Sequence, residues 1–437
     1  MKKITLFMST VAIAMAAGAG FFMWAERHPA LSPIEPPDRD MLDHALVEQG
    51  QMLAAAGYCS SCHTTSSSEP YSGGRATQTP FGVVYATNIS PDPENGIGTW
   101  SEEAFRRAMH EGIRKDGAYL YPAFPYDHFT LITDEDISAL YAYFMAQEPI
   151  PSQPLENELG FPFNIRTLLA GWNLLYFEPG RFEADPEQDD DWNRGGYLVE
   201  ALGHCGACHT PRNALGGPKL GERFAGARVD GWYATGIGAH SPSPLQWSEW
   251  GMVNYLIDGW DRDHGVAAGP MTPVVNHLAL LPEDDIYAMA VYITSFQEDD
   301  DRDRDAILAF AEEREFESQT IPESDFLDDP ALRRGQERFA SSCADCHRRV
   351  SETAPLALAS SVSGPDPINL INVTIDGIRP PDGVPEKSMP RFTTMSDEEL
   401  HDLVSFIRHH FTEEPAWDNI KSAISIAREN FSRSSGR

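Results

Sequence analysis

Apolar residues recur at helical spacing in three similar segments of the chain. Each segment opens with Thr, Pro or Ser, continues with three acidic residues, and then carries apolar residues three or four positions apart. The segments are residues 133–144, 282–293 and 396–407. A capping residue followed by carboxylates is typical of a helix start, because both favour the free N–H groups of the first turn. The pattern therefore predicts three amphipathic helices.

A second predicted helix precedes each of these segments and ends with an acidic residue followed by Gly. The first two run from Trp100 to Gly112 and from Trp247 to Gly259, and both open with Trp-Ser-Glu; the third covers residues 369–377. Ser suits the position that caps a helix, and Gly suits the left-handed position just past its end. The shared opening indicates an internal repeat and duplication of one fold.

A third helix is expected at the start of each repeat, around residues 46–53, 197–199 and 335–339. The sequence thus predicts an all-α chain with three small helical domains, at 41–150, 191–297 and 326–412. Residues 298–325 form an acidic linker, and the tail at 413–437 is either a short helix or disordered. The apolar stretch at 151–190 is either a helix that covers a domain junction or a surface that docks a membrane or partner subunit.

Each repeat contains the motif C-x-x-C-H, and the three motifs use all six cysteines. They are Cys59–His63, Cys205–His209 and Cys343–His347. In this motif both thiols bond the vinyl groups of a c-type haem and the adjacent His binds its iron. Thioredoxin-like and zinc sites do not require that His. Since only 14 of 437 residues are His, three such matches by chance have odds of about 3 × 10⁻⁵. The prediction is three covalent haems, with His63, His209 and His347 as iron ligands.

Cytochrome c iron commonly takes Met as its second protein ligand. Met271 lies 12 residues after Gly259, and Met389 lies 12 residues after Gly377, each beside a Pro. The matched spacing favours both as ligands over core-filling side chains. The same count from Gly112 reaches Phe124, which cannot bind iron. His128 is the favoured substitute; otherwise the iron is five-coordinate or bound by one of Met109, His110 and Met145.

Net charge and the N-terminal segment bear on compartment and partners. The chain carries 66 acidic and 33 basic residues, so nucleic acid is an unfavourable partner. Lys2 and Lys3 precede a run without charge, residues 4–25, which is long enough to span a bilayer. Residues 1–27 are therefore expected to be a membrane anchor, with a cleaved signal as the alternative. Either way we expect the haem domains on the periplasmic face of the inner membrane.

With these motifs and repeats, the chain resembles a known family, the three-haem cytochrome c subunits of periplasmic membrane-bound dehydrogenases. The resemblance covers about residues 41–412 and implies class I cytochrome c-like domains. Residues 120–129 and 171–175 look like cytochromes that accompany molybdenum hydroxylases of the aldehyde or nicotinate dehydrogenase type. The family implies a catalytic dehydrogenase subunit, possibly with an iron–sulfur subunit, as electron donor. It implies ubiquinone or a terminal oxidase as acceptor.

The expected function is electron transfer without substrate chemistry of the chain's own. The sequence contains no G-x-G-x-x-G loop, P-loop or H-E-x-x-H motif. Alternatives are the cytochrome subunit of a quinoprotein alcohol dehydrogenase or a flavoprotein gluconate dehydrogenase. A haem enzyme with an open first haem and a free-standing electron carrier are further alternatives.

Overall fold

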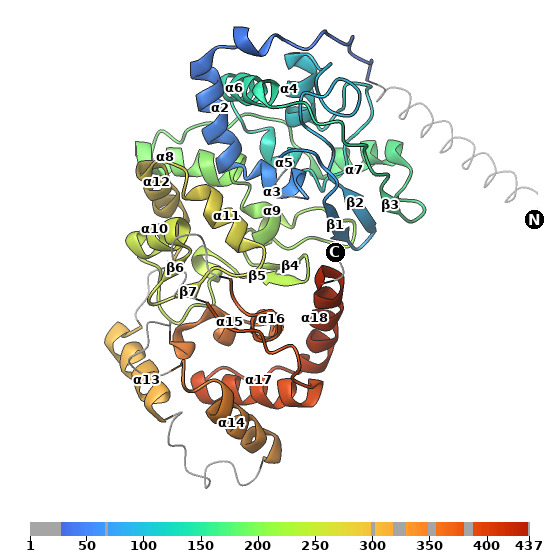
Figure 1. Cartoon of the computed structure of the whole chain (residues 1–437). Coiled ribbons are helices and arrows are strands. Elements are labelled where there is room, and N and C mark those ends of the chain that lie inside the picture. Colours follow the sequence, from blue (N-terminus) through green and yellow to red (C-terminus); the bar gives the residue numbers. More distant parts are fainter. Residues whose placement is uncertain are drawn as a thin grey trace, which may run out of the picture. The chain divides into compact units, whose positions relative to one another are not determined.

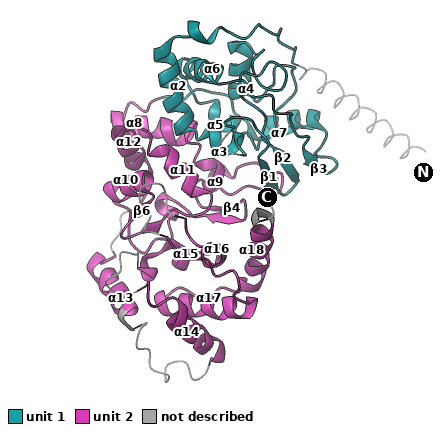
Figure 2. Ribbon diagram, in the orientation of Figure 1, with its two compact units in different colours: residues 1–183 teal, residues 184–437 magenta. Residues whose placement is uncertain are grey.

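The fold is that of a computed structural model, which describes residues 28–65, 69–298, 302–317, 329–347, 355–379 and 388–435 (Figure 1). The chain divides into two compact units, Met1–Glu183 and Ala184–Arg437 (Figure 2). The α-helices of the first unit are α2 (His44–Ala56), α3 (Cys59–His63), α4 (Glu102–Glu111), α5 (Tyr126–Phe129), α6 (Asp134–Ala146) and α7 (Leu169–Tyr176). Two 3₁₀ turns, at Arg39–Met41 and Arg166–Leu168, accompany them.

The second unit contains two successive sets of helices. The first set is α8 (Asp190–Tyr197), α9 (Gly206–His209), α10 (Glu249–Asp258), α11 (Met271–Leu278) and α12 (Glu283–Thr294), with a π-helical turn at Leu198–Leu202. The second set is α13 (Arg304–Glu317), α14 (Pro330–Ser342), α15 (Ser360–Ser363), α16 (Ile368–Asp376), α17 (Asp397–Phe411) and α18 (Ile420–Ser435). 3₁₀ turns lie at Leu220–Glu222, Gly238–His240 and Leu356–Leu358.

Short strands join the helices, so the predicted all-α class is correct for the helical framework only. β1 (Ala76–Thr79), β2 (Gly82–Tyr85) and β3 (Glu158–Leu159) form one antiparallel sheet in that order, with Ala76 opposite Tyr85. β4 (Ala227–Val229) pairs with β5 (Trp232–Ala234), and β6 (Trp260–Asp261) with β7 (Gly265–Val266). Strands of two to four residues are too short to show a readable alternation of apolar and polar positions.

The structure confirms the predicted helices and most of their caps. Thr133 and Ser396 accept backbone N–H groups at the starts of α6 and α17, and Ser396 forms a full capping box. Gly112 and Gly259 take the left-handed conformation after α4 and α10. Gly377 has a φ of 69° but a ψ of −177°, so the left-handed prediction is wrong there. The chain instead continues extended into a bridge between Ile378 and Met389.

Each repeat is built on a close crossing of its first and last helices. The pairs are α2 with α6, α8 with α12, and α14 with α17. A glycine lies at each crossing, because an added Cβ would come within about 2 Å of a carbonyl oxygen on the facing helix. These pairs are Gly50 with Ala139 (2.0 Å), Gly195 with Ala288 (1.9 Å) and Gly335 with Asp402 (2.1 Å). An aromatic residue follows four positions later on the facing helix each time, Tyr143, Tyr292 and Phe406.

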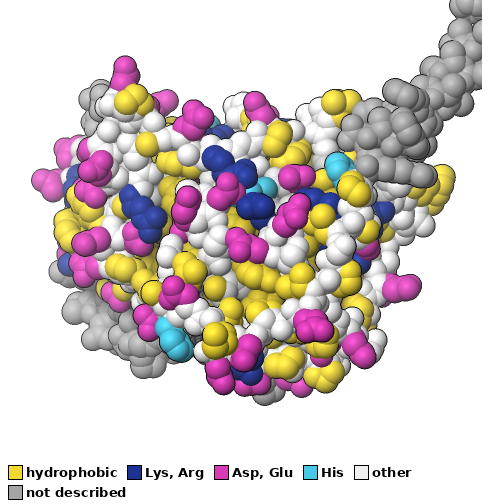
Figure 3. Space-filling view, turned by 90° about the horizontal axis from the view of Figure 1, so that it is seen from above, with side chains coloured by type: hydrophobic (Ala, Val, Ile, Leu, Met, Phe, Trp, Pro, Cys, Tyr) yellow, Lys and Arg dark blue, Asp and Glu magenta, His cyan; other side chains and the backbone are white. Residues whose placement is uncertain are grey.

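The segments outside the repeats are largely helical as well. Residues 304–317, inside the predicted acidic linker, form α13, which packs against α17 and buries Ala311 and Glu315. The predicted tail contains α18, which packs on α16 and α17. Acidic side chains are scattered over the face drawn in Figure 3, whereas basic side chains gather in a few groups there. In the described part of the chain no helix is both long and apolar enough to cross a membrane, and the predicted anchor, residues 1–27, lies outside it.

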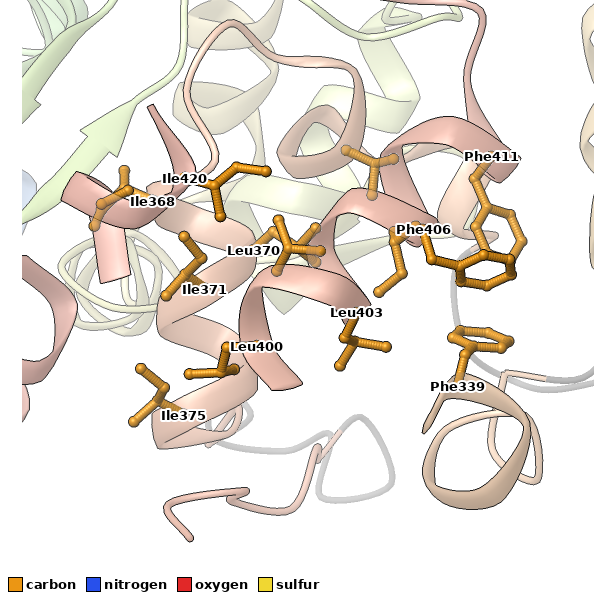
Figure 4. Close-up of a cluster of buried hydrophobic side chains, with 14 of the residues drawn as sticks. Phe339, Ile368, Leu370, Ile371, Ile375, Leu400, Leu403, Phe406, Phe411 and Ile420 are labelled. Carbon is orange, nitrogen blue, oxygen red and sulfur yellow. The ribbon is translucent and has the colours of Figure 1, made fainter. Parts of the chain in front are cut away.

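The last repeat shows how a core forms beside its C-x-x-C-H motif. Phe339 of α14 lies against Phe406 and Phe411 of α17, with ring centres 5.6 and 5.5 Å apart (Figure 4). Apolar side chains of α16 and α18 complete the cluster, among them Ile371 and Ile420. The core of this repeat therefore holds α14, and with it the start of the cysteine motif, at a fixed place.

Candidate haem-binding sites

Each C-x-x-C-H segment forms a tight turn that follows directly on the first helix of its repeat. α3 follows α2, and α9 follows α8 and its π-helical extension. Tyr58 and His204 precede the first two motifs in a left-handed conformation, with φ of 36° and 35°. His209 and His347 each donate a backbone N–H to the first cysteine of their motif, at 2.9 and 3.0 Å. Both cysteines and the His of a motif are therefore held within one turn of backbone.

The six thiols form no disulfide in the structure. Burial raises the pKa of Cys59 and of Cys205 to about 12, and that of Cys343 to about 11. The charge of the second cysteine of the motif adds to the shift in each case, and Glu200 adds to it at Cys205. Redox-active and metal-binding thiols have lowered pKa values. The first thiol of each motif therefore lacks the lowered pKa that is typical of thioredoxin-type sites.

The first two motif histidines are oriented by backbone carbonyl groups. His63 Nδ1 lies 2.6 Å from Thr87 O, and His209 Nδ1 lies 2.6 Å from Thr235 O. A carbonyl only accepts, so Nδ1 must carry the proton, and Nε2 keeps its lone pair. Burial lowers the pKa of both imidazoles, which favours the neutral form. A neutral His with Nδ1–H donated to a carbonyl is the arrangement expected of an iron ligand.

His347 of the third motif has the same burial and a lowered pKa, also caused by burial. Its Nδ1 is buried, and among the described residues it has no hydrogen-bond partner. Residues 348–354, which follow it directly, lie outside the description. The third site is therefore placed by α14 and its aromatic contacts rather than by a visible carbonyl.

The loops that hold Thr87 and Thr235 have the same hydrogen bonds. Gly73 N donates to His63 O, and Gly226 N donates to His209 O, both at 2.8 Å. Ile89 and Ile237, two residues after each Thr, bond back to Tyr71 and Phe224, both at 3.0 Å. Sequence reasoning missed these carbonyl groups, although the repeated Thr-x-Ile at 87–89 and 235–237 was a usable signal.

The loop after the second helix of each repeat places the candidate second ligands. Leu120 N donates to Gly112 O at 2.6 Å, and Ala267 N donates to Gly259 O at 2.8 Å. Four residues beyond these bonds stand Phe124 and Met271. The backbone thus places Phe124 at the position of Met271, as the sequence count predicted. In the third repeat, Met389 exchanges two backbone hydrogen bonds with Ile378, and its side chain is half-buried.

His128 has a structural counterpart in the second repeat. It lies in α5, two residues before Thr130, which caps the end of the helix, and five before the Thr133 cap of α6. His277 lies in α11 at the same distances from Ala279 and Pro282. His277 Nδ1 bonds Pro273 O in its own helix at 2.6 Å. His277 is therefore a matched reference for any test of His128 as an iron ligand.

The alternative ligand His110 is engaged elsewhere. It is 2% exposed, and its Nδ1 lies 2.5 Å from the Arg181 guanidinium. A guanidinium only donates, so Nδ1 accepts and Nε2 carries the proton. Burial, with the nearby Arg181 charge, lowers the pKa of His110 to about 4. The neutral ring thus has no free lone pair, which argues against His110 as an iron ligand. Met109 and Met145 are buried in the same unit.

No cluster of three or more His, Cys, Asp or Glu side chains in the described ranges is arranged to hold a metal ion. The six cysteines, all of which are described, therefore do not form a four-ligand zinc site. Their pairing within single turns, each followed directly by a His that is carbonyl-oriented in the first two motifs, fits covalent haem. The fold and these sites define a c-type cytochrome.

Comparison with known proteins agrees with this class. Residues 330–407 match the family model described as cytochrome C oxidase, cbb3-type, subunit III. The chain is 35% identical to the gluconate 2-dehydrogenase cytochrome c subunit of Pantoea cypripedii, over 89% of this chain and 90% of that protein. It is 34% identical to the fructose dehydrogenase cytochrome subunit of Gluconobacter japonicus, over 84% and 79% of the two chains. The chain belongs to the family of cytochrome c subunits of dehydrogenase complexes, and it is an electron-transfer subunit rather than a catalytic one.

A further relative is longer than this chain. It is a nicotinate dehydrogenase subunit of Pseudomonas putida, which is 41% identical over 94% of this chain. The chain spans only about a third, 34%, of the length of that protein.

Proposed function

We propose that the chain carries three c-type haems in three tandem class I cytochrome c-like domains, at 41–150, 191–297 and 326–412. The observation that carries this proposal is the threefold coincidence of a C-x-x-C-H turn with a glycine-mediated helix crossing. Thioethers would form at Cys59 and Cys62, at Cys205 and Cys208, and at Cys343 and Cys346. Haem iron supplies one-electron redox chemistry, and the protein supplies its ligands and surroundings.

The iron ligands follow from the same repeats. His63, His209 and His347 are the proposed ligands within the motifs, and Met271 and Met389 are the proposed second ligands of haems 2 and 3. We propose His128 as the second ligand of haem 1. The replacement of Met by Phe124 supports a haem 1 that differs from the others, with a lower potential if two imidazoles bind it. An open haem 1 that binds a small ligand is the second candidate, motivated by the same replacement.

The proposed electron donor is a molybdenum hydroxylase that oxidises an aldehyde or an N-heterocycle, possibly through an iron–sulfur subunit. The 41% identity to a nicotinate dehydrogenase subunit supports this donor over gluconate, fructose and alcohol dehydrogenases, whose cytochromes are 33–35% identical. The proposed acceptor is ubiquinone or a terminal oxidase. The uncharged run at residues 4–25 supports a membrane anchor and a place on the periplasmic face of the inner membrane.

Purification of the native membrane complex tests this function. The cytochrome, identified by its covalent haem, is expected to copurify with a larger subunit that contains molybdenum. A flavin or a quinone cofactor in its place would instead assign the chain to the gluconate or the alcohol branch. A cytochrome that purifies alone from gently solubilised membranes would contradict the subunit assignment.

A further inference from the structure

One short stretch of the first unit exposes an unusual amount of apolar surface. Of the fifteen large hydrophobic side chains exposed among the described residues, six lie between residues 161 and 175. They are Phe161, Phe163, Ile165, Leu168, Leu174 and Leu175. Phe161 is 81% exposed, Leu174 74% and Leu175 65%. Contiguous exposed apolar surface of this kind marks a contact with a membrane or another molecule.

Helix α7, within this stretch, is apolar on both sides. Its inner side holds Ala170, which packs against Ile113 and Tyr119, and Asn173, which accepts a 2.6 Å hydrogen bond from Tyr126. Its outer side holds Leu168, just before the helix, and Leu175, and a Cβ added to Gly171 would meet nothing within 4 Å. None of its residues, Leu169–Tyr176, is charged. A helix that is hydrophobic all round is normally buried, so we expect another molecule to cover the outer side of α7.

Basic residues border this apolar surface. Residues 28–183 contain 21 acidic but only eight basic residues, and six of the eight belong to α4, its following loop and the segments that flank α7. They are Arg106, Arg107, Arg114, Lys115, Arg166 and Arg181. Arg166 precedes α7 and donates to Tyr119 O at 2.7 Å, while Arg181 follows it and bonds His110. An apolar face bordered by cations is the composition of helices that lie in a membrane interface.

The described chain also starts next to α7. His28 bonds the Tyr119 hydroxyl at 3.1 Å, and Arg107 donates to Pro29 O at 2.8 Å. His28 and Tyr119 line a cavity of about 460 Å³ together with Leu174 and Phe177 of the α7 segment. The uncharged run ends at residue 25, three residues before His28. An anchor in that run would therefore bring the bilayer to the side of the unit that carries α7.

We propose that the segment 161–175, with α7 at its centre, lies in the membrane interface, and that the bordering Arg and Lys residues bind anionic phospholipid headgroups. The occupant is a lipid bilayer, because the cations complement headgroup phosphates and the proposed anchor starts beside them. The inference rests on the proposed anchor and on the proposed covalent haems. It adds that the first unit lies on the bilayer with a defined face, rather than hanging from a flexible tether.

The test places a single free thiol on this face of the full, haem-loaded chain. In the proposed protein all six native cysteines are bonded to haem, so Leu174→Cys supplies the only reactive thiol. Leu220→Cys in the second unit is the matched control, since Leu220 is also 74% exposed. Both variants are placed in nanodiscs of phosphatidylethanolamine and phosphatidylglycerol and treated with a water-soluble polyethylene glycol maleimide. Modification is followed as a shift in gel mobility.

We expect Leu174→Cys to react about tenfold or more slowly than Leu220→Cys, because the interface shields it. Equal rates in a protein retained by the nanodisc would overturn the docking face and leave the anchor intact. Slow modification that appears only when the dehydrogenase subunit is added would overturn it in favour of a protein contact. Modification of several thiols in the wild-type chain would instead contradict the covalent haems, so the two failures are distinguishable.

Discussion

The glycine at the crossing of α14 and α17 allows a quantitative test of the repeat fold. A Cβ on Gly335 would lie 2.1 Å from Asp402 O and 2.7 Å from Phe406 Cβ, and real Cβ atoms essentially never approach within 3.0 Å. Gly335→Ala must therefore separate the two helices by about 1 Å and loosen the contact of Phe339 with Phe406. Such overpacking costs about 3 kcal/mol. The better helix propensity of Ala returns about 1 kcal/mol.

The net expectation is a loss of about 2 kcal/mol of unfolding free energy, or about 4–8 °C in Tm for a unit of this size. Urea unfolding followed by far-ultraviolet circular dichroism measures it on the haem-loaded protein. Gly50→Ala and Gly195→Ala are expected to have effects of the same size, because their contacts have the same geometry. Gly171→Ala in α7 is the control, and it should leave stability unchanged or raise it by about 0.5–1 kcal/mol. If Gly335→Ala costs no more than Gly171→Ala, the helices do not cross at this glycine and the reasoning is refuted.

Three further substitutions test the sites and the core. Burial raises the pKa of Glu315 to about 7, above the value of its unfolded state, so ionisation opposes folding. The unfolding free energy of the wild-type protein should therefore fall as the pH rises from about 4.5 to 7, and this fall should be absent in Glu315→Gln. Urea midpoints measured against pH test this, with the exposed Glu312→Gln as control. If Glu315→Gln keeps the wild-type dependence of the midpoint on pH, the assignment to Glu315 is refuted. Met271→Leu should lower the midpoint potential of one haem and let its reduced iron bind carbon monoxide, with buried Met289→Leu as control. An unchanged redox titration would leave Met271 as packing. His128→Ala should create carbon monoxide binding at haem 1, whereas His277→Ala should not; avid binding by the wild-type protein would exclude His128 as ligand.

Helices were the part of the fold that local sequence signals could predict. Ser101, Thr133 and Ser396 each accept a hydrogen bond from the residue three positions on, so the signal and the structure it specifies lie in one short window. The spacing from Gly to Met was readable for the same reason, because one loop sets it. Leu120 N donates a hydrogen bond to Gly112 O, which supports that count.

Contacts between distant segments were not readable. The carbonyl of Thr87 orients His63, which lies 24 positions earlier in the chain. Any residue type can supply a backbone carbonyl, so the sequence does not show which residue accepts this hydrogen bond. Gly50, Gly195 and Gly335 lie inside helices, where Gly is intrinsically unfavourable, and only the facing helix explains them. The many charged residues of α13 led to the prediction of an acidic linker, so the apolar side of this helix, which packs against α17, was not predicted. For α7, the apolar composition was compatible with a helix that covers a junction or with a docking surface, and it could not say which side remains exposed.

The central claim is that three haems are bonded to this polypeptide. The direct test is the intact mass of the purified protein after acid denaturation and extraction of non-covalent haem with organic solvent. A double variant, Cys205→Ser with Cys208→Ser, is weighed beside it to identify the increment of one site. The account predicts a wild-type mass equal to the polypeptide plus three haems, and one haem fewer in the variant. A polypeptide that loses all its haem on extraction, or that keeps fewer than three, would contradict it.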